Sequence, residues 1–219
     1  MIRFQDVHKT YKSKSGSVEA LKGVTFDIAD GEFVFVIGKS GSGKSTLLKC
    51  ITCEERPTEG SVLIDGFNIA TMSRALVPVL RRQIGMIYQD FRLIETKTVF
   101  ENIAFAGEIV GMPRKSLNQS VQLMLNVVGL KDKANAYPQE LSGGEQQRVA
   151  IARAIAHFPE VIFADEPTAE LDSNTSRSVI KTFKELVDSQ GITIVMTTHD
   201  MSLMNEGHGI ITLEDGKLI

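Results

Sequence analysis

The chain has 219 residues, which is long enough for one large domain or two small ones. Hydrophobic residues make up 42% and charged residues 23%, an ordinary globular balance in which long disordered stretches are not expected. The formal net charge of -3 gives no overall basic character, so we expect no nucleic-acid partner.

Neither a membrane span nor a secreted scaffold is expected. The apolar runs have strand length, and none approaches the roughly 20 residues that a membrane-spanning helix needs. The N-terminus lacks the basic start and apolar stretch of a signal peptide. The two cysteines, Cys50 and Cys53, are too few for a disulfide scaffold and lack the further ligands of a zinc site. We therefore expect ordinary helix residues there and a cytoplasmic chain.

The first third of the chain is predicted to be rich in strands. Residues 20–28 and 32–37 flank Asp30 and Gly31, a pattern that predicts a hairpin. The second run is apolar throughout, as expected for a strand buried on both faces. It ends at Gly38, where a glycine-rich turn begins. A helix over 46–52 and strands over 61–64 and 85–88 are predicted next.

The middle of the chain, from 98 to 157, has a helical pattern. One helix face carries five apolar residues before Gly129 ends the helix: Leu117, Val121, Met124, Leu125 and Val128. Strands over 161–164, 192–196, 210–213 and 217–219 and an amphipathic helix over 173–189 follow. Strands that alternate with helices predict an α/β fold with a largely parallel sheet. We expect one domain over residues 1–219, with a helical subdomain over about 90–160 inserted in its core.

Eight residues between the second strand and the next helix match the phosphate-loop pattern G-x-x-x-x-G-K-[ST]: Gly38, Lys39, Ser40, Gly41, Ser42, Gly43, Lys44 and Ser45. Glycines allow backbone N–H groups to curl around an anion, and the helix start adds a positive dipole end. Lys44 is expected to reach the β- and γ-phosphates, and Ser45 to bind Mg²⁺. The plain alternative is a flexible glycine–serine turn, which would not require a lysine and a serine here.

The strand predicted over 161–164 ends in two acids, Asp165 and Glu166. Ligand sites of parallel sheets lie at the carboxyl ends of the strands. Asp165 is therefore expected to hold Mg²⁺ beside Ser45, and Glu166 to polarise the water that attacks the γ-phosphate. Alone, the pair would fit a solvated acidic turn equally well, but the phosphate loop favours the catalytic interpretation.

A second candidate anion site lies at the start of a later helix. Ser142 and Glu145 have the spacing of a capping box before an apolar helix. Gly143 and Gly144 would weaken the first turn of that helix, which is understandable if an anion approaches the backbone there. A helix start without any ligand is the plainer alternative.

Together, these motifs resemble the nucleotide-binding domain of ATP-binding-cassette (ABC) ATPases over essentially the whole chain, in the family's order. The resemblance implies a P-loop NTPase fold with a RecA-like parallel core, an N-terminal antiparallel β subdomain and a helical signature subdomain. It implies ATP and Mg²⁺ as cofactors, ATP hydrolysis and an ATP-dependent head-to-tail homodimer. Each ATP would lie between the phosphate loop of one chain, extended to Thr46, and Ser142, Gly143 and Gly144 of the other.

The resemblance also assigns roles to single residues. Tyr11 would stack on adenine, Gln89 would contact Mg²⁺ and the γ-phosphate, Asp172 would lie beside the nucleotide in the D-loop, and His199 would contact the γ-phosphate. Simpler alternatives are a half-exposed strand aromatic for Tyr11, polar surface for Gln89 and a structural hydrogen-bond partner for His199. Glu170 departs from close relatives, and a carboxylate near the dimer interface would repel phosphate.

A partner on another chain is expected. The chain lacks the N-K-x-D base reader of GTPases and is too short for the insertions of chromosome-organising ATPases. Segments 77–85, 89–94 and 97–104 resemble FtsE-type cell-division ATPases. This implies an integral membrane partner of FtsX type, peripheral attachment to the inner face of the membrane, and control of cell-wall hydrolases. The alternatives are ATPases of LolD or MacB type, which serve lipoprotein release or export, and a soluble nucleic-acid ATPase. The region 89–103 is the candidate coupling surface.

Overall fold

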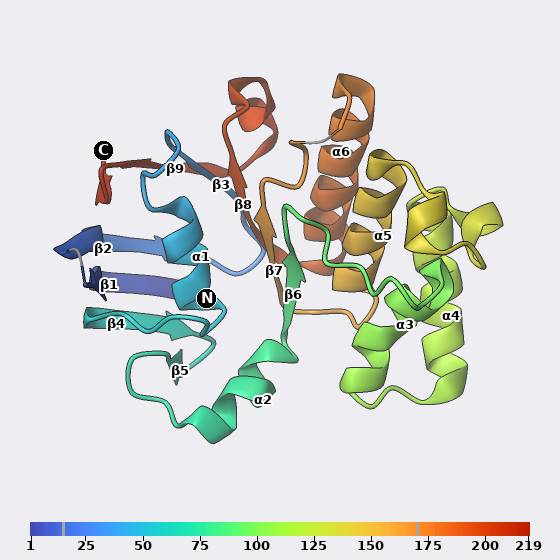
Figure 1. Cartoon of the computed structure of the whole chain (residues 1–219), viewed down its shortest axis with the longest axis horizontal. Helices are drawn as coiled ribbons and strands as arrows, with labels where there is room; N and C mark the ends of the chain where they lie inside the picture. The colour runs from blue at the N-terminus through green and yellow to red at the C-terminus, as the bar shows by residue number, and fades with distance from the viewer. Residues whose placement is uncertain (15, 170) are drawn as a thin grey trace.

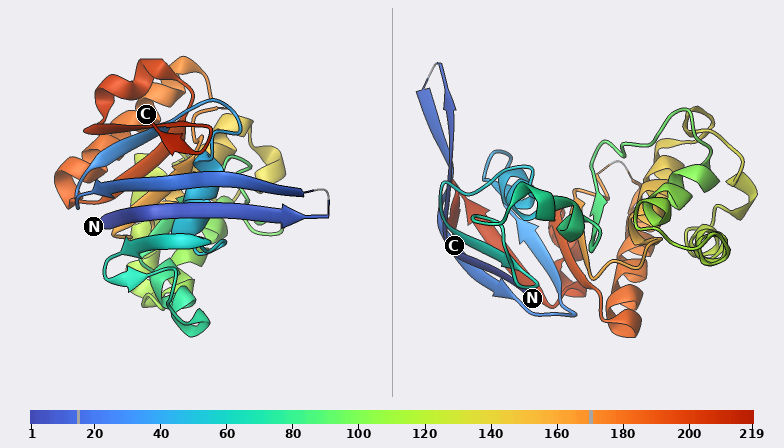
Figure 2. Two further views of the ribbon diagram at one scale, coloured as in Figure 1. Left: turned by 90° about the vertical axis from the view of Figure 1, so that its left-hand side faces the viewer. Right: turned by 90° about the horizontal axis from the view of Figure 1, so that it is seen from below.

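The structure, a computed structural model, describes residues 1–14, 16–169 and 171–219. Two β-sheets lie on either side of helix α1 (Lys44–Ile51), as Figure 1 shows. The first sheet is antiparallel, with strand order β2-β1-β4-β5. Its strands are β1 (Ile2–Ser13), β2 (Gly16–Ile28), β4 (Glu59–Ile64) and β5 (Phe67–Asn68). β1 and β2 project as a hairpin beyond the rest of the molecule (Figure 2).

The second sheet has six strands in the order β10-β9-β3-β8-β7-β6. Neighbouring strands are parallel from β9 through β6, and the short β10 runs antiparallel to β9. The strands are β3 (Phe33–Ile37), β6 (Ile84–Ile87), β7 (Val161–Asp165), β8 (Thr193–Thr198), β9 (Gly209–Glu214) and β10 (Lys217–Leu218). A parallel core sheet beside an N-terminal antiparallel sheet confirms the predicted α/β fold class.

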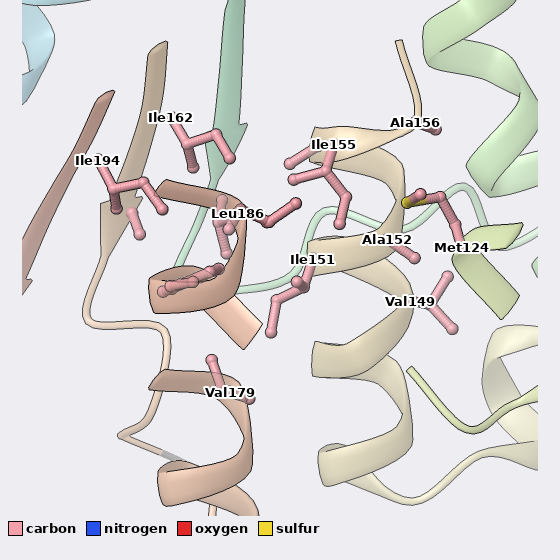
Figure 3. Packing of buried hydrophobic residues seen from close by; sticks show 14 of the residues in the cluster. Met124, Val149, Ile151, Ala152, Ile155, Ala156, Ile162, Val179, Leu186 and Ile194 are labelled. Carbon is pink, nitrogen blue, oxygen red and sulfur yellow. The ribbon is translucent and has the colours of Figure 1, made fainter. Parts of the chain in front are cut away.

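The longer helices cover the two faces and one edge of the parallel sheet. α1 packs between the two sheets, in contact with β2, β4 and β7. α5 (Gly143–Ile155) and α6 (Ser173–Gln190) lie on the opposite face, where their apolar side chains meet those of β7 and β8 (Figure 3). α3 (Val99–Ile109) and α4 (Arg114–Val127) pack on α5 beyond the edge strand β6 (Figure 1).

The shorter helices lie in the connections. They are α2 (Val77–Arg81) and the 3-10 helices η1 (Arg74–Leu76), η2 (Lys131–Lys133), η3 (Pro138–Glu140) and η4 (Met201–Glu206). In the ranges that the structure describes, no helix is both long enough and apolar enough to cross a membrane.

Strand β3 lies between two hydrophobic clusters of the described residues. Its five residues are all buried, and successive side chains point to opposite faces. Phe33, Phe35 and Ile37 belong to the cluster that contains α3, α4, α5 and α6. Val34 and Val36 belong to the cluster that contains α1 and the antiparallel sheet. The continuous apolar run of this strand is therefore explained by burial on both faces, as predicted.

The helical pattern predicted over 98–157 corresponds to three helices, α3, α4 and α5, with turns and short 3-10 helices between 128 and 142. The predicted apolar face lies on α4: Leu117, Val121, Met124 and Leu125 are buried, and Val128 is partly buried against the same cluster. Gly129 follows the end of α4 with a φ of 66°, a conformation that suits glycine at a helix end.

The predicted hairpin across Asp30 and Gly31 is wrong. β2 pairs with β1, whereas β3 pairs with β8 and β9 in the other sheet. The turn, in which Gly31 has a φ of 74°, therefore carries the chain from one sheet to the other. The reason lies in β3, because five consecutive buried residues need cover on both faces, and β2 is largely exposed along its first half.

Candidate active site

The phosphate loop connects the buried strand β3 to helix α1. The turn spans 38–43, and Lys44 is the first residue of the helix. Three of its glycines have positive φ angles that other residues rarely adopt: 155° at Gly38, 79° at Gly41 and 109° at Gly43. The chain therefore reverses its direction within a few residues and starts a helix beside the end of a fully buried strand.

Two of these glycines also have no room for a side chain. A Cβ atom at Gly38 would lie 2.3 Å from the carbonyl oxygen of Leu213, and one at Gly43 would lie 2.6 Å from that of Ala20. Both neighbours are backbone atoms of strands, β9 and β2, which cannot move aside without disturbing their sheets. Nothing lies within 4 Å of the corresponding position at Gly41. The loop is thus packed tightly at both ends and open in its middle.

Lys44 is buried beneath this loop, with 6% of its surface exposed. Its ammonium group donates hydrogen bonds to the carbonyl oxygens of Gly38, at 2.7 Å, and Lys39, at 3.1 Å. Ser42 is also buried, and its Oγ has no hydrogen-bond partner among the described residues. A shielded cation in a glycine-rich turn suits the binding of an anion.

A cavity of about 550 Å³ opens at this loop. Its walls include the loop residues from Gly38 to Thr46 other than Ser42, together with Ala20, Gln89, Glu166 and His199. Gln89 follows β6, Glu166 follows β7 and His199 follows β8, so three neighbouring strand ends contribute to the site. The volume lies within the ~300–1,000 Å³ that is usual for ligand pockets.

Asp165 and Glu166 lie at the carboxyl end of β7, and Thr197 of β8 hydrogen-bonds to both. The Thr197 hydroxyl donates to Asp165 Oδ1 at 2.7 Å and accepts the N–H of Glu166 at 2.9 Å. Glu166 has a left-handed φ of 46°, and its Oε2 lies 3.3 Å from His199 Nδ1. The Glu166 side chain is 21% exposed and that of His199 is 68% exposed. The carboxylate is therefore partly shielded, while the imidazole faces solvent.

The signature segment begins α5 with the predicted capping box. The Glu145 carboxylate accepts the N–H of Ser142 at 2.8 Å, and the Ser142 hydroxyl accepts the N–H of Glu145 at 3.3 Å. The Ser142 hydroxyl also donates to this carboxylate, at 3.0 Å, and the two bonds from Ser142, first that of its N–H and then that of its hydroxyl, hold the pKa of Glu145 below its ordinary value. Among the described residues, a Cβ atom at Gly143 would meet nothing within 4 Å, and one at Gly144 would make ordinary contacts with Leu171, at 3.5 Å, and Arg148, at 4.0 Å. Packing against the described residues therefore does not require these glycines.

Several predicted site residues are not among the residues that line the cavity. Ser142, Gly143 and Gly144 are at the start of α5 and contribute nothing to its walls in the same chain. Asp165, the last residue of β7, also does not line it.

Tyr11 lies in β1, opposite Val18 of β2, and is outside the cavity walls as well. The ammonium group of Lys9 lies 5.1 Å from the centroid of its ring, which is within the range of a cation–π contact. The Tyr11 hydroxyl is buried without a hydrogen-bond partner in the described part of the chain. These contacts fit the simpler interpretation, in which Tyr11 is a half-exposed aromatic residue of a strand.

Asp172 caps the first turn of α6. Its Oδ1 accepts the N–H groups of Asn174, at 2.9 Å, and Thr175, at 3.1 Å. The hydrogen bond from the Thr175 side chain and those from the backbone lower the pKa of Asp172. The carboxylate thus has a structural function as a helix cap. Glu170, whose carboxylate is expected near the dimer interface, lies outside the described residues.

Three further residues were not predicted from the sequence. Thr197 fixes the two acids, and Ala20 of β2 lines the cavity beside the loop. Gln147 of α5 is 1% exposed and donates from its Nε2 to the carbonyl oxygen of Pro167 at 2.6 Å, immediately after Glu166. For Thr197 and Gln147, the only sequence signal is a polar residue within an apolar strand or helix, which does not identify its partner, and Ala20 has no signal of this kind.

A glycine-rich loop around a buried lysine, with a carboxylate and a histidine from neighbouring strand ends, defines a P-loop nucleoside triphosphatase. A family model described as ABC transporter matches residues 21–169. The chain therefore belongs to the ABC transporter family of ATPases, and it binds and hydrolyses ATP.

Curated relatives align over the whole chain. The cell division ATP-binding protein FtsE of Bacillus subtilis is 45% identical over 220 residues, which cover 100% of this chain and 95% of the relative. The protein of the same name from Streptococcus pneumoniae strain R6 is 41% identical, with 94% of the relative covered. The methionine import ATP-binding protein MetN 1 of Oceanobacillus iheyensis is 42% identical over the same length, but only 65% of that relative is covered.

Solved structures agree with this assignment. A dimeric ATP-binding cassette in a post-hydrolysis state with ADP and phosphate has a TM-score of 0.94 and 39% identity, and the match covers 100% of this chain and 96% of that one. A cassette from the cbiONQ transporter complex of Clostridium perfringens has a TM-score of 0.88 and 29% identity, with 86% of that chain covered.

Proposed function

We propose that the chain is the ATP-hydrolysing subunit of a membrane complex of the FtsE type. It would drive an FtsX-type integral membrane protein on a separate chain, in cell division and the control of cell-wall hydrolases. The observation that carries this proposal is the 45% identity to an FtsE protein across the whole chain. In this arrangement the protein lies in the cytoplasm, attached to the inner face of the membrane through its partner.

The nucleotide phosphates would bind in the loop from Gly38 to Thr46. Lys44 now donates to two loop carbonyls, at Gly38 and Lys39, and would exchange these bonds for stronger ones to the β- and γ-phosphates.

The residues near the loop also fit a magnesium ion. Ser45, Gln89 and Asp165 offer hydroxyl, amide and carboxylate oxygens, which are the ligands that Mg²⁺ prefers. No cluster of three or more His, Cys, Asp or Glu that could hold a metal occurs in the described ranges, so the remaining ligands would be phosphate oxygens and water. When bound, Mg²⁺ neutralises phosphate charge; Ser45, Gln89 and Asp165 would position it.

Glu166 and His199 would act on the γ-phosphate side. Glu166 is held by the Thr197 hydroxyl at its N–H and lies 3.3 Å from His199, at the wall of the cavity. From there, its carboxylate would orient a water and accept a proton from it, the role of a general base. His199 would hydrogen-bond to the γ-phosphate and keep the Glu166 side chain in place.

The signature residues would complete the site of a second copy. Ser142 and Gly143 are exposed, and neither they nor Gly144 line the cavity of their own chain. The start of α5 can offer backbone N–H groups and a positive dipole end to an anion that approaches from outside. Two solved neighbours are described as dimeric, which supports a head-to-tail homodimer with ATP between the two chains.

The membrane subunit would dock in a groove beside the glutamine segment. This cavity of about 420 Å³ lies between α2, β6, α3 and α5, next to the predicted coupling region 89–103. Its walls combine apolar side chains, such as Phe105 and Ile109, with the cationic side chains of Arg81, Arg82 and Arg153. A short cytoplasmic segment with apolar and acidic side chains would be complementary to it.

The second candidate is the ATPase subunit of an importer, and it is favoured by the 42% identity to MetN. Co-expression separates the two candidates. The chain is produced with an FtsX-type membrane protein or with the membrane subunit of a methionine importer, and co-purification and ATPase stimulation are measured. We expect both signals with the FtsX-type protein. Copurification with the importer subunit alone would overturn the proposal, and stimulation by DNA or RNA alone would indicate a nucleic-acid ATPase.

A matched pair of variants tests the docking groove in the same assay. Arg82→Glu reverses a charge on the groove wall and should weaken copurification. Lys115→Glu reverses a charge on the exposed surface of α4, outside the groove, and should leave copurification unchanged. Depletion in cells should give chains of undivided cells, whereas normal division with failure of methionine uptake or of export would support the alternatives.

A further inference from the structure

The segment that follows Gln89 has an unusual backbone. Phe91 and Arg92 are consecutive residues with left-handed φ angles of 58° and 48°, although neither is glycine. Such conformations cost on the order of 1–3 kcal/mol each and persist only where surrounding contacts hold them. The turn after β6 therefore needs contacts that hold its backbone in this conformation.

The contact that holds this turn comes from α5. Arg153 donates from one guanidinium nitrogen to the carbonyl oxygen of Arg92 at 2.6 Å, and from another to that of Phe91 at 2.7 Å. The planar guanidinium fork suits two neighbouring acceptors, which a single ammonium group would not match. Burial lowers the pKa of Arg153, and no carboxylate within the described ranges forms an ion pair with it.

The turn makes further contacts on its other side. The Arg92 guanidinium lies 3.7 Å from the centroid of the Tyr88 ring, and its Nε lies 3.1 Å from Asp90 Oδ1. These contacts involve residues within four positions of each other, so they shape the turn without attaching it to another element. Among the described residues, Arg153 makes the side-chain hydrogen bonds that attach the backbone of Phe91 and Arg92 to α5.

α5 contacts both strand-end segments that border the γ-phosphate side of the cavity. Through Arg153 it holds the turn after Gln89, and through Gln147 it holds the carbonyl oxygen of Pro167, one residue after Glu166. Ser142 is the N-cap of the same helix, about 16 Å from Arg153 along the helix axis. A single helix therefore connects the signature residues to both segments.

We propose that Arg153 is a positioning residue for Gln89: its fork holds the turn after β6 so that Gln89 stays at the cavity wall and follows the position of α5. The inference rests on the role proposed above for Gln89. Arg153 touches neither nucleotide nor reacting water; it acts through the backbone of Phe91 and Arg92. Through this contact, a displacement of the signature helix changes the position of the glutamine.

The test compares nucleotide affinity with turnover in the purified chain. Arg153→Gln should lower kcat for ATP hydrolysis roughly 10-fold or more, while the affinity for ATP changes little. The reason is that a displacement of a catalytic group by about 1 Å can lower the rate up to roughly 100-fold. Arg114→Gln, which removes a charge from the exposed start of α4, is the control and should behave as the unchanged protein. Thermal unfolding of each variant is measured in parallel.

A suppressor distinguishes positioning from a merely structural role. Glycine adopts left-handed φ angles at little cost, so Arg92→Gly should restore part of the turnover lost in Arg153→Gln. Arg92→Ala removes the same side chain without that freedom, so it should not restore turnover. Equal effects of glycine and alanine, or an unchanged kcat in Arg153→Gln, would overturn the proposal. If Arg153→Gln is not recovered folded, Arg153→Lys, which keeps the charge but not the fork, carries the same comparison.

Failure of the proposed role of Gln89 would be recognised separately. If Gln89→Ala hydrolyses ATP at the original rate, the role of Gln89 is wrong. If Gln89→Ala is slow and Arg153→Gln is not, only the positioning role of Arg153 is refuted.

Discussion

Replacing Gly43 with alanine tests whether the shape of the phosphate loop is fixed by its packing. Gly43 caps α1 with a φ of 109°, and a Cβ atom there would lie 2.6 Å from the carbonyl oxygen of Ala20 and 3.1 Å from Leu21 Cδ2. The backbone conformation costs about 1–3 kcal/mol for a residue other than glycine. The steric overlap adds about 1–3 kcal/mol, because β2 or the loop must move.

Gly41→Ala is the matched control for this prediction. It also places alanine at a positive φ, of 79°, but in open space, so we expect a loss of about 1–2 kcal/mol from the backbone alone. Both substitutions reduce the entropy of the unfolded chain equally, and that effect cancels in the comparison.

Urea unfolding without nucleotide measures the free energy of unfolding of both variants. The thermal midpoint should fall by roughly 2–4 °C for each kcal/mol in a chain of this size. Gly43→Ala should therefore unfold well before Gly41→Ala, and it should also lose affinity for a fluorescent ATP analogue. A Gly43→Ala variant as stable as Gly41→Ala would show that the loop adapts easily and would refute the reasoning.

Three further substitutions concern the site. Glu166→Gln should keep ATP binding but slow hydrolysis, measured as phosphate release, about 100- to 10,000-fold. Glu185→Gln, on the surface of α6, is the control and should hydrolyse ATP at the original rate. An unchanged rate in Glu166→Gln would exclude Glu166 as the general base. Thr197→Val removes the hydroxyl that bridges both acids and should lower kcat more than ATP affinity; the reverse ratio would contradict its positioning role. Ser142→Ala should lower the free energy of unfolding by about 1 kcal/mol through loss of the α5 cap, measured in urea, and a stability equal to the original would contradict that estimate.

The elements that local chemistry determines were predictable from the sequence. The apolar run before Gly38, the glycine pattern of the loop and the capping box at Ser142 each act over a few residues, and the structure has a buried strand, a tight turn and a capped helix at these places. The acids after the apolar strand lie at the carboxyl end of β7 for the same reason. The roles of these residues with ATP stay predictions.

Features that depend on contacts between distant segments were not predictable. The turn at Asp30 and Gly31 has hairpin composition, but the choice of partner for β3 depends on strands some 160 and 180 residues further along, β8 and β9. Likewise, the sequence does not reveal that Thr197 bonds to Glu166 or that Arg153 bonds to Phe91. A single sequence shows which residues are polar within an apolar pattern, but only the pairing of the chain gives their partners.

The alternating side chains of β3 have a consequence for unfolding. Adjacent residues of one strand are anchored in different hydrophobic clusters, so neither cluster can lose its packing while the other keeps this strand in register. Amide hydrogens of β3 should then exchange with solvent only when the entire molecule opens, and they should be among the slowest in the chain. The antiparallel sheet and the helical layer are in this sense a single cooperative unit, joined by β3 and by β7 and β8, whose side chains alternate between the same two clusters.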